Sequence, residues 1–168
     1  MTPSTSFDGS RMPSTAQEDD LAQLLSRVAM ECPAESSVWL GPGLPRHLKD
    51  TLAHARVKAD PPANLAVVEV RAVSQDGKAE VEATIPDQVD RVIGIGACTE
   101  GTLSQLIRES DGASTAIDRL ICPLAVFDFR DGRILIREIR RGLTAADLQR
   151  DVLPNLWAEP NLKELGTD

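Results

Sequence analysis

Two side chains of this sequence, Glu69 and Cys98, stand where they could act directly on a substrate. Cys98 follows a strand predicted over residues 91–96, and a thiolate at a strand end can serve as a nucleophile. A small residue packed in the core suits the same position, so both interpretations stay open. Glu69 interrupts the apolar run over residues 65–70. It either faces solvent on an alternating strand or, in a central strand, needs a partner for its charge, which would make it a candidate site residue.

Gly41 and Gly43 lie in the segment 41–45 (G-P-G-L-P), between a strand predicted over residues 37–40 and a helix predicted over residues 46–56. A glycine-rich turn at the start of a helix leaves backbone N–H groups free to bind an anion or a developing oxyanion. A tight structural turn has the same pattern. The segment is therefore a candidate binding turn, with a purely structural role as the alternative.

Gly94 and Gly96 lie at the end of the strand predicted over residues 91–96. Thr99 stands where the dinucleotide fingerprint G-x-G-x-x-G requires its third glycine, and the sequence contains no Gly-Lys-Ser/Thr of a P-loop. Both nucleotide-binding motifs are thereby excluded.

The composition argues against several classes of function. The formal net charge is −8 and aromatic residues make up 3% of the chain, so the sequence supplies neither a basic surface for nucleic acid nor platforms for base stacking. The three cysteines form no C-x-x-C pair, and His47 and His54 are two helical turns apart, so we expect no disulfide framework and no bound metal. Neither a signal peptide nor a membrane-spanning apolar run is recognisable, and we expect a cytoplasmic protein without membrane or nucleic-acid partners.

Hydrophobic periodicity predicts one α/β domain over residues 15–153, with a disordered tail over 1–14 and a loose C-terminal tail over 154–168. Alternating strands and helices indicate a mostly parallel sheet flanked by helices. Two β-rich runs joined through Asp131-Gly132 predict a C-terminal β-hairpin. Two helices are predicted to begin at Thr15 and at Thr144, and two more are predicted over residues 46–56 and 102–110. Strands and apolar runs are predicted over residues 37–40, 65–70, 91–96, 117–129 and 133–139.

Several segments carry family-like motifs. Residues 116–129 (AIDRLICPLAVFDF) resemble D-x-I-I-T-D-L-A-V-F, and residues 131–148 are similar to D-G-L-x-L-x-E-x-x-x-G-x-T. Residues 92–99 line up with V-I-V-A-M-E-H-T, and residues 41–45 are similar to G-I-G-L-P. These motifs are those of the β-subunit type of class I CoA-transferases, the family of the 3-oxoacid and glutaconate CoA-transferases, which the chain resembles.

The resemblance implies a CoA-transferase/isomerase-type α/β fold, an acyl-CoA thioester as substrate, no permanently bound cofactor, and a site shared with an α-like subunit or a second copy. In the family, a β-subunit glutamate in an S-E-N-G motif attacks the thioester, and the glycine-rich turn helps to hold its oxygen. This sequence contains no Glu-Asn-Gly, Pro123 replaces the usual Asp before L-A-V-F, and Glu69 does not align with the missing nucleophile.

Three functions therefore stay open. The chain is a β-like subunit of a divergent CoA-transferase-family enzyme that performs transfer, hydrolysis or decarboxylation, or it is an inactive pseudoenzyme for assembly or regulation, or it is a stand-alone small-molecule binding domain. For the enzyme, the candidate catalytic residues are Cys98 and Glu69, and the candidate binding residues are Gly41, Gly43, Gly94 and Gly96.

Overall fold

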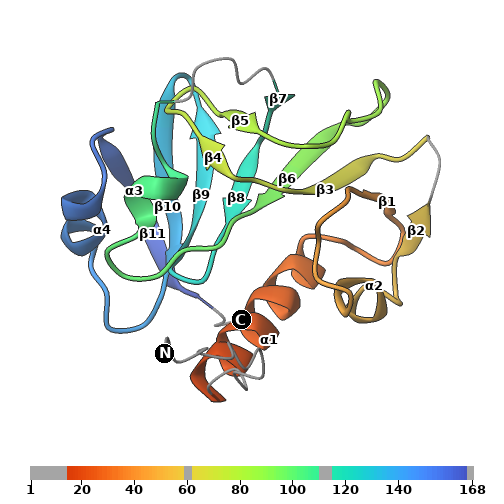
Figure 1. The fold of residues 1–168 in the computed structure, drawn as a ribbon, viewed down its shortest axis with the longest axis horizontal. Helices are drawn as coiled ribbons and strands as arrows, with labels where there is room; N and C mark the ends of the chain where they lie inside the picture. Colours follow the sequence, from red (N-terminus) through yellow and green to blue (C-terminus); the bar gives the residue numbers. More distant parts are fainter. Residues whose placement is uncertain (1–14, 59–61, 110–114, 166–168) are drawn as a thin grey trace, which may run out of the picture.

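The computed structural model describes residues 15–58, 62–109 and 115–165, with side chains from Asp19 onward (Figure 1). The tail predicted over residues 1–14 lies outside the described residues. The helices in the described part are α1 (Thr15–Met30), α2 (Leu48–Thr51), α3 (Leu103–Leu106) and α4 (Ala145–Asp151). Figure 1 shows α1 and α2 below the sheet and α3 and α4 toward its left-hand side.

An eight-stranded sheet forms the centre of the described structure, in the order β11-β10-β9-β8-β6-β3-β1-β2. All neighbouring pairs from β2 to β8 are parallel, as is β10 with β11, whereas β9 is antiparallel to both of its neighbours. The predicted α/β class with a mostly parallel sheet is therefore confirmed. The strands are β1 (Ser37–Leu40), β2 (Arg56–Lys58), β3 (Leu65–Glu69), β6 (Arg91–Ile95), β8 (Arg119–Ile121), β9 (Ala125–Arg130), β10 (Arg133–Ile139) and β11 (Leu156–Glu164).

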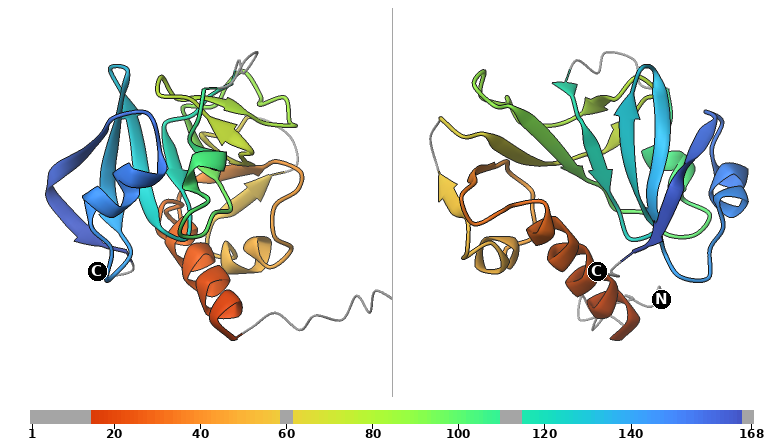
Figure 2. Two further views of the ribbon diagram at one scale, coloured as in Figure 1. Left: turned by 60° about the vertical axis from the view of Figure 1, so that its left-hand side comes forward. Right: turned by 180° about the vertical axis from the view of Figure 1, so that it is seen from behind.

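Both faces of this sheet are covered, which explains why its central strands are largely apolar. Along β3, Leu65 and Val67 face a core that includes α1 and α2 residues, whereas Val68 faces a second core that includes α3 and α4 residues. The two further views in Figure 2 show these helix pairs separated by the sheet. The burial of residues 65–68 thus marks β3 as a central strand rather than a half-exposed one.

The predicted hairpin is present as β9 and β10. Asp131 and Gly132 both have positive φ, at 51° and 69°, and this is the backbone that a two-residue hairpin turn of matching twist requires. The hairpin does not end the sheet, because β11 pairs in parallel with β10. The prediction of a loose tail over residues 154–168 is therefore wrong for Leu156–Glu164. The spacing of apolar residues there is too irregular to indicate a strand, and pairing with β10 supplies the missing order.

A second sheet of three antiparallel strands, which the sequence did not predict, packs over one face: β4 (Ala72–Val73), β5 (Lys78–Glu80) and β7 (Thr115–Ala116). Gly77 makes the turn before β5 with φ of 81°, and a Cβ there would lie 2.9 Å from the Cβ of Phe129. A glycine is thus required both by the turn and by its close approach to the main sheet.

The helices begin where expected, but two are shorter than predicted. The helix predicted over residues 46–56 is reduced to α2, and that over 102–110 is reduced to α3. For α4 the predicted capping box is present: the Thr144 hydroxyl accepts a hydrogen bond from the Asp147 N–H, and Asp147 accepts one from the Thr144 N–H.

Candidate active site

The ends of the parallel strands bring the predicted site segments to one edge of the sheet. Backbone hydrogen bonds continue the ladder just beyond the strands, from Gly41 to Val67, from Val70 to Ile95 and from Gly96 to Ile121. Open α/β sheets bind ligands in the crevice outside the carboxyl ends of their strands. The glycine turn after β1, Glu69 at the end of β3 and the loop after β6 all lie along this edge.

Glu69 and Gly43 are brought into direct contact at this edge. Gly43 has φ of +83°, and a Cβ at this position would lie 2.0 Å from Oε2 of Glu69. A residue with a Cβ would be strained by the positive φ and would force the Glu69 carboxylate to move. The glycine-rich turn and the acid that the sequence marked separately therefore form one unit, which we call the Glu69–Gly43 pair.

The Glu69 carboxylate is exposed at the end of an otherwise buried central strand. Among the described residues, no group donates a hydrogen bond or forms an ion pair to this carboxylate. Within the same part of the chain, the N–H groups of Gly43 and Leu44 also have no hydrogen-bond partner. An unpaired carboxylate thus lies against a turn with unpaired backbone donors, and these are the two kinds of group that nucleophilic attack and oxyanion binding use.

Gly41 has a different role from Gly43. Its N–H is bonded to the Val67 carbonyl at 2.9 Å, and a Cβ there would lie 3.2 Å from Cγ1 of Val68. Gly41 thus lets the turn leave β1 close against β3. It positions the Glu69–Gly43 pair without offering its own N–H to a ligand.

Gly94 and Gly96 face the core. A Cβ on Gly94 would lie 2.6 Å from Cγ2 of Val70, and a Cβ on Gly96 would lie 2.6 Å from Cδ2 of Leu106. A side chain at either glycine would push Val70 or Leu106 out of its packed position. These contacts explain both glycines by packing, and the ligand-binding role predicted for them remains a prediction.

Cys98 is buried in the core on the α3 and α4 side of the sheet. A hydrogen bond with Cys122, together with burial, raises the pKa of the Cys98 thiol. The thiol is therefore protonated at neutral pH, and a buried thiol of this kind is a poor nucleophile. The catalytic role predicted for Cys98 remains a prediction, but the geometry gives Glu69 the better position for chemistry.

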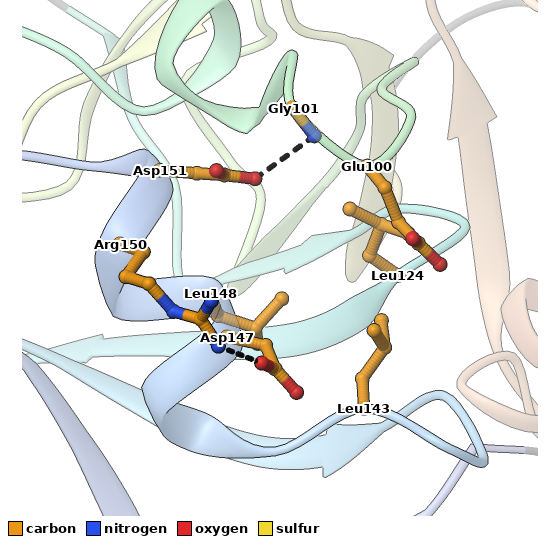
Figure 3. A pocket seen from close by; sticks show the side chains of 8 residues that line it. All are labelled: Glu100, Gly101, Leu124, Leu143, Asp147, Leu148, Arg150 and Asp151. Atoms are coloured by element: carbon orange, nitrogen blue, oxygen red, sulfur yellow. Dashed lines mark hydrogen bonds and ion pairs between the residues drawn. The ribbon is translucent and has the colours of Figure 1, made fainter.

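A cavity of about 320 Å³ opens beside the loop that follows β6 (Figure 3). Leu124, Leu143 and Leu148 give it an apolar lining. Its polar groups already have partners: Asp151 accepts a hydrogen bond from the Gly101 N–H at 2.9 Å, and Arg150 pairs with Asp147. These contacts mainly fix α4 against this loop. No pattern in the sequence predicted the cavity.

A group of paired acidic and basic side chains between α1 and the sheet was not predicted from the sequence. Arg27 binds Glu31 at 2.7 Å and Glu138 at 2.6 Å, and Arg119 binds Asp128 at 2.6 Å and also pairs with Glu31. We call these five residues the ion cluster. The available signal was the pair of charges, Arg119 and Asp128, that interrupts the apolar run over residues 117–129.

The ion cluster holds the carboxylate of Glu31 in the charged form. Burial alone would raise the pKa of Glu31, but the charges and hydrogen bonds of Arg119 and Arg27 outweigh it and lower that pKa. The side chain of Glu31 is only 8% exposed, so its negative charge depends on these arginines. The ion cluster therefore joins α1 to β8, β9 and β10 and is structural.

In the described part of the chain, no three His, Cys, Asp or Glu residues are grouped so that they could hold a metal ion. Over the same residues, no helix combines the length and the apolar character needed to cross a membrane.

Comparison with solved structures identifies the architecture. The chain superposes on the decarboxylase AibA/AibB with a TM-score of 0.63 at 11% sequence identity, covering 89% of each chain. It superposes on the acyl-CoA transferase YdiF of Escherichia coli O157:H7 with a TM-score of 0.64 at 16% identity, covering 87% of this chain and 43% of that one. The chain has a CoA-transferase-like fold.

Other comparisons agree with this fold without extending it. IpdAB of Rhodococcus jostii RHA1 matches with a TM-score of 0.56 at 12% identity, covering 89% of this chain and 88% of that one. A YdiF structure in a thioester complex with CoA matches with a TM-score of 0.65. A scan against protein-family models finds no match, and a search of curated proteins finds none either. The CoA-transferase-like fold expected from the motifs is thus confirmed by structure alone.

Proposed function

We propose that this chain is a β-like subunit that acts on an acyl-CoA thioester, with Glu69 as the nucleophile and the turn around Gly43 as the oxyanion-binding element. The observation that carries the proposal is the Glu69–Gly43 pair, in which a Cβ on Gly43 would lie 2.0 Å from Glu69 Oε2. The CoA-transferase-like fold supports it, since two of the matching structures are an acyl-CoA transferase and its thioester complex with CoA.

The chemistry that follows needs only a carboxylate and the substrate. A Glu69 carboxylate oxygen attacks the thioester carbonyl, the C–S bond breaks, and CoA leaves as a thiolate, so that a mixed anhydride joins Glu69 to the acyl group. The CoA thiolate then attacks the glutamyl carbonyl of the anhydride, which releases the acyl group as a carboxylate and leaves a glutamyl-CoA thioester. The N–H groups of Gly43 and Leu44 stabilise the oxyanion formed in each attack.

A partner chain is part of this proposal. An anhydride or thioester on an exposed glutamate is open to hydrolysis, and enzymes protect such intermediates by excluding water. Glu69 is exposed on this chain. We expect an α-like subunit, or a second copy of this chain, to cover the Glu69–Gly43 pair and complete the site.

The test is to find the covalent intermediate. The tagged protein is purified together with the chains that accompany it in its own cells, and the complex is incubated with acetyl-CoA and with succinyl-CoA. Peptide mass spectrometry is expected to find CoA joined to the peptide that contains Glu69, less one water, and hydroxylamine is expected to remove it. Glu69→Gln should abolish the adduct, whereas Glu35→Gln, at another exposed glutamate, should leave it unchanged.

An adduct on another residue, or undiminished turnover by Glu69→Gln, would overturn the role of Glu69. A pseudoenzyme is the second candidate, and it is favoured by the absence of any described group that orients the Glu69 carboxylate. That alternative predicts an intact complex in which no acyl-CoA yields an adduct and in which Glu69→Gln changes nothing.

A further inference from the structure

The segment of residues 46–58, which contains α2 and β2, is basic in an acidic chain. Its four Lys and Arg residues against a single Asp give it a formal charge of +3, whereas the whole chain has −8. It begins three residues beyond Gly43, and Figure 1 shows α2 and β2 beside β1, the strand that leads into the glycine-rich turn. We call it the basic segment. Positive charge therefore lies next to the candidate active site of an acidic protein.

The bases of the basic segment have no acidic partner in the described part of the chain. There, the exposed side chains of Arg46, Lys49 and Arg56 form neither an ion pair nor a hydrogen bond, and Lys58 donates only to the Pro62 carbonyl at 3.3 Å. Every other described Lys or Arg that precedes β9 forms an ion pair with an acid: Arg27, Arg71, Lys78, Arg91, Arg108 and Arg119. An anionic ligand would therefore meet no competing acid at these bases.

Arg46 and Lys49 are the bases of this segment that lie nearest to Gly43 along the chain. The Leu48 N–H is bonded to the Pro45 carbonyl at 3.0 Å, so a hydrogen-bonded turn runs directly from the glycine-rich turn into α2. Residues three apart on such a turn are neighbours on its surface. Leu48 is buried in the core shared with α1, whereas both bases are exposed. Arg46 and Lys49 therefore present two positive charges side by side to solvent.

We infer that Arg46 and Lys49 bind the phosphates of CoA while its thioester lies against the Glu69–Gly43 pair. This inference rests on the proposed function and names the element that recognises the far end of the substrate. The pantetheine arm has about thirteen bonds between its sulfur and the nearest phosphorus, so it spans roughly 15 Å when extended. The Cα atoms of Gly43 and Arg46 are at most about 11 Å apart, and the arginine side chain adds to this reach.

The two side chains also match the phosphates in chemistry. A guanidinium binds phosphate oxygens through two parallel hydrogen bonds, and an ammonium binds them as a compact charge. An acidic protein repels a polyanion such as CoA as a whole, so bases gathered beside the site offset that repulsion where the ligand enters. Arg46 and Lys49 thus supply affinity for the nucleotide end of CoA and leave the reacting end to Glu69.

Binding of CoA, which involves no reaction, tests the inference. The protein, purified with the chains that accompany it, is titrated in a calorimeter with CoA, with 3′-dephospho-CoA and with pantetheine. A chain carrying both Arg46→Gln and Lys49→Gln should bind CoA about tenfold or more weakly, because hydrogen bonds to charged groups are lost, and should bind pantetheine as before. Dephospho-CoA should lose less than CoA if one base binds the 3′-phosphate.

The matched control removes the same two kinds of charge elsewhere. Arg130→Gln with Lys163→Gln changes two exposed bases without ion pairs among the described residues, on β9 and β11 toward the other end of the strand order. These changes should leave the affinity for all three ligands unchanged. Circular dichroism confirms that both double variants are folded.

Three results would overturn the inference: unchanged CoA affinity in the Arg46→Gln, Lys49→Gln chain, an equal loss of affinity for CoA and pantetheine, or loss of the accompanying chains from the purified complex. The last result would show that these bases bind an acidic partner protein instead. Failure of the proposed function looks different, because CoA would still bind through Arg46 and Lys49 while no adduct formed on Glu69. Undiminished adduct formation by the double variant at limiting acyl-CoA would reject the inference alone and leave the role of Glu69 in place.

Discussion

The Glu69–Gly43 pair and the ion cluster are two acidic regions on the same sheet with opposite surroundings. Glu31 of the ion cluster is 8% exposed and pairs with Arg27, Arg91 and Arg119, whereas Glu69 is exposed and has no partner among the described residues. A carboxylate whose charge is neutralised by arginines stabilises the fold but is a poor nucleophile. A carboxylate held against a glycine turn without a partner costs stability little and is free to act on a ligand.

The largest effect that tests this comparison is on activity. Glu69→Gln keeps the shape of the side chain but replaces the carboxylate with an uncharged amide. We expect kcat to fall by about 10³-fold or more, as is common when a covalent nucleophile is lost. Transfer of CoA from the acyl-CoA to an added carboxylic acid by the purified complex measures it, because the second acid must free Glu69 from the glutamyl-CoA thioester. Thermal unfolding of the variant should be unchanged within error, because Glu69 makes no described polar contact. A variant that loses stability but keeps its turnover would reverse the roles assigned to the two regions.

The corresponding change in the ion cluster should affect stability instead. Glu31→Gln removes the charge shared by three arginines and leaves Arg27 and Arg119 under-compensated in a buried position. Breaking a buried pair from one side typically lowers the free energy of unfolding by about 3–5 kcal/mol. Urea unfolding of the variant against the natural chain measures the loss. A change below about 1 kcal/mol, the size seen for exposed pairs, would show that the cluster is not structural.

Acid should act on the same cluster without mutation. The pKa of Glu31 is lowered below its ordinary value of 4.5 in the folded chain, so the folded state binds this proton less readily than the unfolded state does. The stabilisation from Glu31 is therefore complete above that value, and it is lost as pH falls below it toward the folded pKa. Unfolding free energy measured between neutral pH and acid should fall less steeply in Glu31→Gln than in the natural chain. Identical slopes would remove Glu31 as a source of acid sensitivity.

Local patterns predicted much of the fold, and contacts between distant segments account for what they missed. The Asp131-Gly132 turn and the Thr144 cap depend on neighbouring residues, so both could be predicted. The strand β11 depends on the edge of β10, and no periodicity of its own marks it. In the sequence, a glycine that makes room for a ligand looks the same as one that makes room for a packed side chain. Only the structure shows that Gly94 and Gly96 make room for Val70 and Leu106.

The candidate site shows the same limit. Glu69 and Gly43 are far apart in sequence, and they meet because β1 and β3 pair in parallel with Leu40 opposite Val67. The S-E-N-G motif is missing, and Glu69 does not align with the glutamate of that motif. The structure nevertheless places Glu69 against the glycine turn, a contact that no motif predicted.

The finest test of the comparison is at Gly43. Gly43→Ala places a methyl group at φ of +83°, which costs about 1–2 kcal/mol for a non-glycine residue, and directs it at the Glu69 carboxylate. Because Glu69 is exposed at the end of a flexible side chain, it can turn away, so urea unfolding should show little loss beyond this backbone strain. Turning away separates the carboxylate from the Gly43 and Leu44 N–H groups, and turnover should therefore fall much more than stability does. Gly101→Ala, at another exposed glycine of positive φ with no atom within 4 Å of a Cβ, is the matched control and should show the strain without the loss of turnover. Equal losses of turnover in the two variants would mean that Gly43 matters only for its backbone, and that the contact with Glu69 has no part in the chemistry.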